Sequence, residues 1–343
     1  MEFEVVYDSD DCAVIPQSFA EFQIGSIITC NPGMIDLINV CLRIAKSDAP
    51  ILITGESGVG KELLSELIHS NSNRRKEPFL KINCAAIPDS LKESELFGYE
   101  PGAFTGALKH GKKGLIEASQ NSTLLMDEIG EMPLNMQSTL LRVLQDGRFV
   151  RVGGSKEIRS DVRLICATNK NLKNLVDEGL FRNDLYFRLN VIPLTIPSLA
   201  ERPEDISLLT LYYTDYFNRQ YNSQKRLQRN LLEAFSYRHW TGNVRELRNT
   251  MERLVLIAMH EIISAEDLKY IDAINQHEPS RDADEQMKEV PLQHQDKPLK
   301  EMVDAFEIDL IKKAIDQHGS LRKAAKALDV TPSTISRKLT RHQ

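Results

Sequence analysis

Between residues 33 and 197, short apolar runs alternate with longer stretches of helical periodicity. The apolar runs have the composition of buried strands, and they occupy residues 51–54, 79–82, 123–126, 162–167 and 191–196. Strands that alternate with helices pair as a parallel sheet with helices on both faces. The pattern therefore predicts an α/β fold for this part of the chain.

Helical periodicity without strand-like runs continues over residues 198–271, which predicts a helical subdomain after the sheet. Residues 275–299 then mix Gln, His, Asp and Lys with three prolines, a composition typical of a linker. The two patterns together predict that a separate domain lies beyond the linker.

The C-terminal residues show the pattern of three helices. The first covers residues 299–318, and two shorter helices follow at 321–328 and from Pro332 to about residue 342. Proline suits a first helical turn because the donor it lacks would have no partner there. The apolar positions expected to form the seam between the two short helices are Ala324, Ala325, Leu328, Ile335 and Leu339. This spacing predicts a helix-turn-helix, with a three-helix dimerisation module as the alternative.

Charge distinguishes the two ends of the chain. The formal net charge is −6, and residues 1–24 contain six acidic residues and no Lys or Arg. Residues 319–343 contain six Lys and Arg against one Asp, a balance of 6 − 1 = +5. A dimerisation module does not need this excess, so it favours contact with DNA. The residues expected to face the major groove and the phosphates are Arg322, Lys323, Ser333, Thr334, Ser336, Arg337 and Lys338.

Residues 1–24 lack clear periodicity and are too few for a sensory domain. A solvated acidic leader and an acidic arm that docks a partner both fit them. We therefore expect no N-terminal regulatory domain. Control would then fall to a separate regulatory protein or to the abundance of the protein, unless the sequence is a fragment of a longer chain.

The chain shows no signal for a membrane or a secretory route. Its longest purely apolar run, residues 254–259, is far shorter than the ~18 residues of a membrane span. No cationic, apolar leader opens the sequence. The five cysteines are scattered without Cys-x-x-Cys spacing, which favours reduced thiols over disulfides or a zinc site. We expect a cytoplasmic protein whose 343 residues form two or three domains.

A glycine-rich loop follows the first predicted strand and precedes a helical stretch. Its residues are Gly55, Glu56, Ser57, Gly58, Val59, Gly60, Lys61 and Glu62. In this context the backbone N–H groups surround a polyphosphate and Lys61 reaches its terminal phosphates. Glu62 departs from the usual pattern, because Ser or Thr normally holds Mg²⁺ at that position. The metal is therefore expected to depend on water and on a carboxylate elsewhere.

Polar residues follow three of the predicted strands. The strand at 123–126 ends in Asp127 and Glu128, where Asp127 would hold Mg²⁺ through water and Glu128 would act as the general base. Asn83 closes the strand at 79–82 and is placed to hold Glu128 until ATP is seated. Thr168 and Asn169 follow the strand at 162–167 and are placed to sense a γ-phosphate.

Residues 102–107 form an unusual loop. Its residues are Gly102, Ala103, Phe104, Thr105, Gly106 and Ala107, and Pro101 precedes them. Proline and two glycines argue against a regular helix or a central strand. Taken alone, the loop fits both a Phe104 that folds back into the core and a Phe104 offered to a partner.

These motifs together resemble the AAA+ activators of sigma-54 RNA polymerase, the bacterial enhancer-binding proteins. The stretches that carry the resemblance are residues 55–62, 82–86, 93–107, 125–133, 167–169 and 240–247. The family implies an AAA+ P-loop parallel sheet with a helical lid, followed by a small all-α helix-turn-helix domain. The expected domains are an acidic leader at 1–24, an α/β ATPase subdomain at 25–197, a helical lid at 198–272, a linker at 273–299 and a Fis-type DNA-binding domain at 300–343.

The resemblance also implies roles for single residues. Arg182 and Arg188 correspond to arginines that one subunit offers to the nucleotide of its neighbour. Arg245 corresponds to a second sensor that reaches the nucleotide from the lid, and residues 147–154 correspond to a loop that supports residues 102–107.

The implied activity is ATP hydrolysis with Mg²⁺ in a ring, expected to be a hexamer with dimers as an alternative resting state. Hydrolysis would move residues 102–107 against sigma-54, so that the RNA polymerase holoenzyme opens a promoter after the protein binds enhancer double-stranded DNA. Two other functions stay open. Another AAA+ machine would share the nucleotide site without needing residues 102–107. A non-catalytic DNA-binding repressor would need a damaged nucleotide site, and only Glu62 departs from the pattern.

Overall fold

The computed structural model describes residues 3–104, 108, 110–275, 311, 314–315, 319–327 and 330–340. Its contacts divide the chain into two compact units, Met1–Asn275 and Gln276–Gln343. Among the described residues, every helix is too short or too polar to span a membrane.

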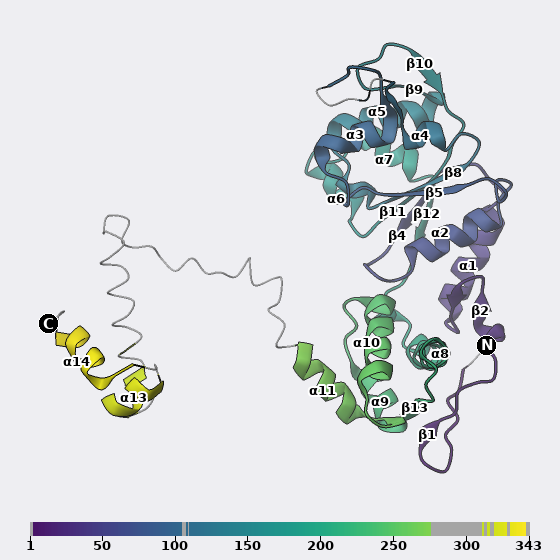
Figure 1. Ribbon diagram of the computed structural model, residues 1–343. Helices are drawn as coiled ribbons and strands as arrows, with labels where there is room; N and C mark the ends of the chain where they lie inside the picture. The colour runs from purple at the N-terminus through teal and green to yellow at the C-terminus, as the bar shows by residue number, and fades with distance from the viewer. Residues whose placement is uncertain are drawn as a thin grey trace. The chain divides into compact units, whose positions relative to one another are not determined.

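Five parallel strands form the central sheet of the first unit (Figure 1). Their order across the sheet is β12 (Ile192–Thr195), β4 (Ile51–Thr54), β11 (Arg163–Thr168), β8 (Thr123–Asp127) and β5 (Phe79–Asn83). All four neighbouring pairs are parallel, which confirms the predicted fold class. β5 and β8 each extend one residue beyond the prediction, because the ladder also pairs Asn83 with Asp127.

The pleat of the sheet sends alternate residues to opposite faces. In β4, Ile51 and Ile53 join the core on one face, whereas Leu52 joins the core on the other. The first face is covered by α1 (Pro32–Ile44) and α2 (Lys61–Ser70), and the second by α3 (Asp89–Phe97), α4 (Leu115–Ala118), α5 (Leu134–Asp146), α6 (Leu172–Asp177) and α7 (Asn183–Leu189) (Figure 1). Both faces of the sheet are therefore buried, as the continuous apolar strands require.

Two short strand pairs lie beyond this second layer of helices. β6 (Gly98–Tyr99) pairs with β7 (Lys112–Lys113), and β9 (Arg148–Val150) pairs with β10 (Glu157–Arg159). An isolated bridge between Tyr99 and Val152 joins the two pairs. The chain between β6 and β7 contains residues 102–107, so both ends of this loop are fixed by backbone pairing.

The helical subdomain follows the sheet. It consists of η3 (Leu199–Glu201), α8 (Glu204–Tyr221), α9 (Arg229–Tyr237), α10 (Asn243–Ile257) and α11 (Ala265–Asn275), with β13 (Arg226–Gln228) and β14 (Ile262–Ile263) between helices. Trp240 and Phe235 belong to its core, with ring centroids 5.0 Å apart. The prediction of an all-helical subdomain missed these two strands. They are only three and two residues long, and such short runs show no readable period.

The N-terminal segment packs against this subdomain. β1 (Cys12–Ala13) pairs with β13, and the next elements are η1 (Ala20–Phe22), β2 (Gln23–Ile24) and β3 (Ile27–Ile28). Asp8 and Asp10 form ion pairs with Arg226. A hydrogen bond from the Cys12 N–H, together with the charge and hydrogen bond of Arg226, holds the pKa of Asp8 below its usual value. This acidic segment is therefore not a freely solvated leader, because β1 pairs with β13 and two of its aspartates pair with Arg226.

The second unit contains α13 (Leu321–Ala327) and α14 (Pro332–Thr340) among its described residues. Ala325 and Ile335 are buried together with Ile311, which confirms their predicted places in the seam. Pro332 begins α14, as predicted. The linker expected at 273–299 and the helix expected at 299–318 lie largely outside the described residues.

Candidate nucleotide-binding site

A cavity of about 310 Å³ lies where the carboxyl edge of the sheet meets the helical subdomain. Three parts of the chain line it: residues 26–28 at β3, residues 57–63 of the glycine loop and its helix, and side chains of the helical subdomain that include Arg202, Tyr212 and Arg245. Asp127 and Glu128 complete the wall. Its volume falls at the lower end of the range for small-molecule sites.

The glycine loop has a backbone that side chains would disturb. Gly58 and Gly60 have φ values of +80° and +109°, which L-residues rarely adopt. A Cβ atom at Gly58 would also lie 2.2 Å from the carbonyl oxygen of Gly242. α2 begins at Lys61, so the loop presents backbone N–H groups and a helix N-terminus to the cavity. This arrangement suits a polyphosphate.

Lys61 is buried and folded onto its own loop. Its Nζ donates to the carbonyl oxygens of Gly55 and Glu56 at 2.8 and 3.0 Å. Burial lowers the pKa of Lys61, and the nearby charges of Glu128 and Asp127 act against this shift. The ammonium group is thus held at the cavity by the two carbonyl oxygens.

Glu62, which departs from the usual pattern of the loop, forms an ion pair with Lys81. Its Oε1 lies 2.7 Å from Lys81 Nζ, and both side chains are partly exposed. Among the described residues, the structure contains no cluster of three or more His, Cys, Asp or Glu that could hold a metal by itself. Mg²⁺ usually binds one or two carboxylates together with substrate phosphates, and Asp127 provides such a carboxylate. The donor set therefore fits Mg²⁺ only together with a nucleotide.

The predicted catalytic acids occupy the end of β8. Glu128 has a left-handed φ of 52°, rare for a non-glycine residue, and its N–H donates to Asp127 Oδ1 at 3.0 Å. Glu128 Oε2 accepts a hydrogen bond from the Asn169 N–H at 3.3 Å. Thr168 is fully buried, and its Oγ1 accepts from the Lys170 N–H at 3.0 Å. The turn after β11 is thus in direct contact with Glu128, the predicted general base.

The expected contact between Asn83 and Glu128 is not formed in this structure. Asn83 Oδ1 instead accepts from the N–H groups of Ala85 and Ala86, at 2.8 and 3.3 Å. An asparagine at a strand end commonly makes this local turn. The carboxylate of Glu128 is oriented by Asn169, as described above.

Side chains of the helical subdomain reach the glycine loop. Arg245 Nη1 donates to Ser57 Oγ at 2.9 Å. Asn243 Nδ2 donates to Glu56 Oε2 and to the Ser57 carbonyl oxygen, at 2.9 and 3.0 Å. No sequence pattern predicted this role of Asn243. A polar residue at a predicted helix start is nevertheless a recognised signal for local hydrogen bonding.

Arg182 and Arg188 do not line the cavity of their own chain. Arg182 is exposed and pairs with Asp184, with Nη2 and Oδ2 2.7 Å apart. Arg188 Nη2 donates to the Leu144 carbonyl oxygen at 2.9 Å, and the neighbouring Phe187 is 65% exposed. Arg182, directly before α7, and Arg188, within it, therefore both lie on the surface of the chain.

The structure describes Gly102, Ala103 and Phe104 of the predicted loop, and Thr105, Gly106 and Ala107 lie outside the described residues. Phe104 is 41% exposed, and its ring centroid lies 5.0 Å from that of Tyr99, which is buried. Phe104 therefore lies on the apolar base of the loop while much of its surface stays accessible.

Residues 147–154 support this loop. The Glu100 N–H donates to the Val152 carbonyl oxygen at 3.0 Å, and Gly153 lies so close to Ala103 that a Cβ atom would be 2.8 Å from it. Arg151 pairs with Glu117 at 2.8 Å and with Glu100 at 3.2 Å. The two loops are thus joined by backbone and charge contacts.

The described DNA-binding candidates have mixed surroundings. Lys323 and Ser333 are exposed, while Thr334 and Lys338 are half-buried. Thr331 Oγ1 forms hydrogen bonds with the hydroxyls of Ser333 and Thr334 at 2.9 and 2.8 Å, at the start of α14. The side chains of Arg322, Ser336 and Arg337 lie outside the described part of the chain.

Comparisons with known proteins agree along the chain. A family model described as the sigma-54 interaction domain matches residues 27–195, one described as an AAA+ ATPase lid domain matches residues 200–286, and one described as a helix-turn-helix domain matches residues 296–343. The regulatory protein AtoC of Escherichia coli is 49% identical over 251 residues, which are 72% of this chain and 54% of AtoC.

A second relative, named a putative uric acid sigma-54-dependent transcriptional regulator, UacR of Escherichia coli, is 41% identical over 88% of this chain and 51% of its own length. The chain thus spans about half the length of these two relatives. The crystal structure of NtrX from Brucella abortus in complex with ATP superposes with a TM-score of 0.67 and 31% identity, over 94% of this chain and 71% of NtrX.

Proposed function

Because the chain belongs to the sigma-54-dependent transcriptional activators and carries their AAA+ ATPase domain, we propose that it hydrolyses ATP between the subunits of a ring and thereby converts a closed sigma-54 promoter complex into an open one. The observation that carries the proposal is a single cavity lined by Lys61, Asp127, Glu128 and Arg245. A phosphate-binding lysine, an acid pair and a cation from a second subdomain are the parts that phosphoryl transfer needs.

Each residue has a defined part in this mechanism. The glycine loop and Lys61 hold the phosphates of ATP, and Glu128 accepts the proton of the attacking water. Asp127 would hold Mg²⁺ through water, and the ion would supply positive charge that neutralises the phosphates. Arg182 and Arg188 of a neighbouring subunit would stabilise the charge on the transferring phosphoryl group.

The partners follow from the remaining parts of the chain. Residues 102–107 would contact sigma-54 in the RNA polymerase holoenzyme. The C-terminal helix-turn-helix would bind enhancer double-stranded DNA, and a cytoplasmic location is proposed with it. The ring is proposed to be a hexamer, with dimers as the alternative resting state. A separate regulatory protein is proposed as the source of control.

Thr105→Ala tests the activator function against that of another AAA+ machine. We expect the variant to keep most of its ATPase activity and to lose its ATP-dependent association with the sigma-54 holoenzyme, measured by gel shift on a closed promoter complex. His110→Ala, an exposed change outside residues 102–107, is the matched control. Retained association in Thr105→Ala would refute the role of the loop. Absence of ATPase activity in the wild type at high protein concentration would instead favour a non-catalytic repressor.

A further inference from the structure

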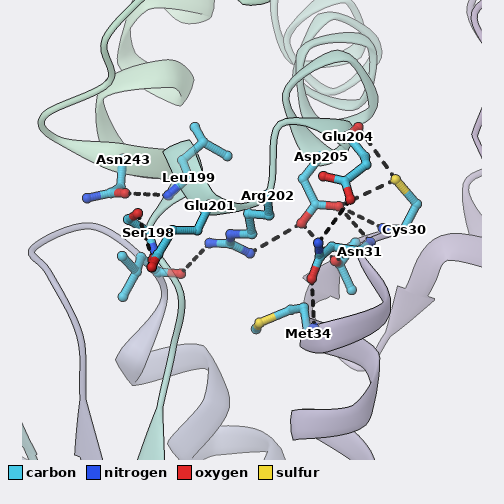
Figure 2. Close-up of polar contacts among 12 residues, drawn as sticks. Cys30, Asn31, Met34, Ser198, Leu199, Glu201, Arg202, Glu204, Asp205 and Asn243 are labelled. Carbon is cyan, nitrogen blue, oxygen red and sulfur yellow. Dashed lines mark hydrogen bonds and ion pairs between the residues drawn. The ribbon is translucent and has the colours of Figure 1, made fainter.

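Two buried charged residues lie in the connection between the sheet and the helical subdomain. Arg202 and Asp205 are 2% and 0% exposed. Arg202 lies just before α8, and Asp205 lies in the first turn of that helix (Figure 2). Their side chains form an ion pair, with Arg202 Nη1 and Asp205 Oδ2 3.4 Å apart. A buried ion pair loses hydration energy and contributes little net stability by itself. The role of this pair must therefore come from its contacts with other segments.

Asp205 holds the segment that precedes α1. Its Oδ1 accepts from the N–H groups of Cys30 and Asn31 at 2.7 and 3.1 Å, and its Oδ2 accepts from Thr29 Oγ1 at 2.7 Å (Figure 2). This segment continues directly from Ile27 and Ile28, which line the cavity. The carboxylate therefore fixes one wall of the cavity to the start of α8.

Arg202 reaches the glycine loop. Its Nη2 donates to the Val59 carbonyl oxygen at 3.0 Å, and the residue itself lines the cavity. Burial lowers the pKa of Arg202, and the carboxylate of Asp205 acts against this shift. The guanidinium group thus connects the loop that receives the phosphates with the carboxylate that holds residues 29–31.

We propose that Arg202 and Asp205 are positioning residues for the nucleotide. They hold the glycine loop, residues 27–31 and the start of α8 in one arrangement, so that the helical subdomain keeps Arg245 within reach of the bound phosphates. This inference rests on the proposed nucleotide binding at the cavity. Neither residue is assigned a catalytic step.

Arg163 provides a matched control. It is 1% exposed, and it also donates to backbone carbonyl oxygens, those of Ala45 and Ile44. Its Nε is buried without a hydrogen-bond partner, as is that of Arg202. Arg163 begins β11, at the opposite end of that strand from Thr168, so it shares the burial of Arg202 without its contact to the glycine loop.

The experiment compares Arg202→Met with Arg163→Met in the full chain. Both changes remove a buried cation, and both are expected to lower the melting temperature. Only Arg202→Met should weaken binding of a fluorescent ADP analogue, by about tenfold or about 1.4 kcal/mol. Arg163→Met should stay within about twofold of the wild type, because it is distant from the cavity. Fluorescence of Trp240, the single tryptophan, reports whether the helical subdomain is folded.

Asp205→Asn gives a readout specific to positioning. It keeps the size of the side chain but removes the charge, so the amide hydrogens of Cys30 and Asn31 should exchange faster while the protein stays folded. Arg202→Lys should restore part of the affinity, because one ammonium group can reach only one of the two acceptors.

Three outcomes overturn the inference. Equal losses of ADP affinity in Arg202→Met and Arg163→Met would show a general effect of stability. Unchanged affinity in a folded Arg202→Met would remove the positioning role. Weaker ADP binding by Arg202→Met, without faster amide exchange of Cys30 and Asn31 in Asp205→Asn, would instead assign Arg202 a direct contact with the nucleotide. If the wild type itself bound no ADP, the proposed function would fail instead.

Discussion

At the scale of single residues, the site depends on backbone conformations that most residues avoid. Glu128 and Asn243 both have φ near 52°, and strained positions of this kind cost about 1–3 kcal/mol each. They persist because neighbouring contacts fix them: Glu128 contacts Asn169, and Asn243 contacts the glycine loop. The carboxylate of Glu128, the proposed general base, is therefore oriented by a hydrogen bond from its own chain.

Glu128→Gln should separate ATP binding from hydrolysis. The amide oxygen can still accept from the Asn169 N–H, but it cannot take the proton of the attacking water. We expect unchanged ATP affinity and a fall in turnover of about 10²–10⁴-fold, measured by phosphate release. Glu131→Gln, a partly exposed acid in the next turn, should keep full turnover. Full turnover in Glu128→Gln would contradict the mechanism.

At the scale of elements, α3 links the nucleotide site to residues 102–107. The helix begins after the turn that Asn83 caps and ends at β6, the base of the loop. Lys92 on α3 is buried, and its Nζ donates to the carbonyl oxygen of Glu131 at 3.1 Å, three residues after Glu128. We propose that this contact passes a displacement near Glu128 to the helix that carries the loop.

Lys92→Met should uncouple the loop from hydrolysis. The change keeps the aliphatic stem but leaves the Glu131 carbonyl oxygen without this donor, at a cost of about 1–3 kcal/mol in stability. We expect ATPase activity close to that of the wild type and weaker ATP-dependent binding of sigma-54. Lys170 pairs with the partly exposed carboxylate of the same Glu131, with Nζ and Oε1 2.8 Å apart, so Lys170→Met is the matched control. Equal sigma-54 binding by Lys92→Met and the wild type would refute the coupling.

The N-terminal segment acts as part of the helical subdomain. Phe19 is 7% exposed, and its ring meets that of Tyr212 with centroids 5.4 Å apart. Tyr212 also lines the nucleotide cavity. A residue of the acidic segment therefore supports a wall of the site.

Phe19→Ala should weaken both stability and nucleotide binding. Removing a buried aromatic ring costs about 3–5 kcal/mol, measured here by urea unfolding followed at Trp240. We expect the KM for ATP to rise, because Tyr212 loses the ring that supports it. Val14→Ala removes an exposed side chain of the same segment and should change stability by less than about 0.5 kcal/mol. The two variants behaving alike would argue against a structural role of the segment.

At the scale of the whole molecule, one chain does not bring every predicted catalytic residue together. Arg182 directly precedes α7 and Arg188 lies on it; both are exposed and neither lines its own cavity, as a role in a neighbouring subunit requires. The exposed Phe187 between them adds apolar surface of the kind that interfaces cover. Hydrolysis would then depend on assembly, and ATPase activity per chain would rise with protein concentration.

Mixing two inactive variants tests this arrangement. Arg182→Ala keeps the proposed base, Glu128, but lacks an arginine offered to the neighbouring subunit, whereas Glu128→Gln keeps this arginine and lacks the base. In a random equimolar ring, about a quarter of the interfaces would pair an intact Glu128 with an intact Arg182 from the neighbour. Part of the ATPase activity should therefore return. Arg219→Ala, which removes another exposed arginine paired with an aspartate, should be active alone. An inactive mixture would indicate that the arginine acts within its own chain.

The parts of this protein whose chemistry lies in short contiguous segments could be predicted from the sequence. The glycine loop, the acids that end β8 and the polar turn after β11 could each be found because a strand end and its following residues lie together in the chain. The same reasoning found the parallel sheet, since β4, β8 and β11 each contain a run of at least three apolar residues.

Which distant residues meet could be seen only in the folded chain. Asp8 and Arg226 are 218 positions apart, and Thr29 and Asp205 are 176 apart, so no local period connects them. Acidic and basic residues near a chain end or at a helix start follow the pattern of solvent-exposed residues. Their burial and pairing depend on which surfaces the folded chain brings into contact, and that is why the supports of the nucleotide site could not be predicted while its central residues could.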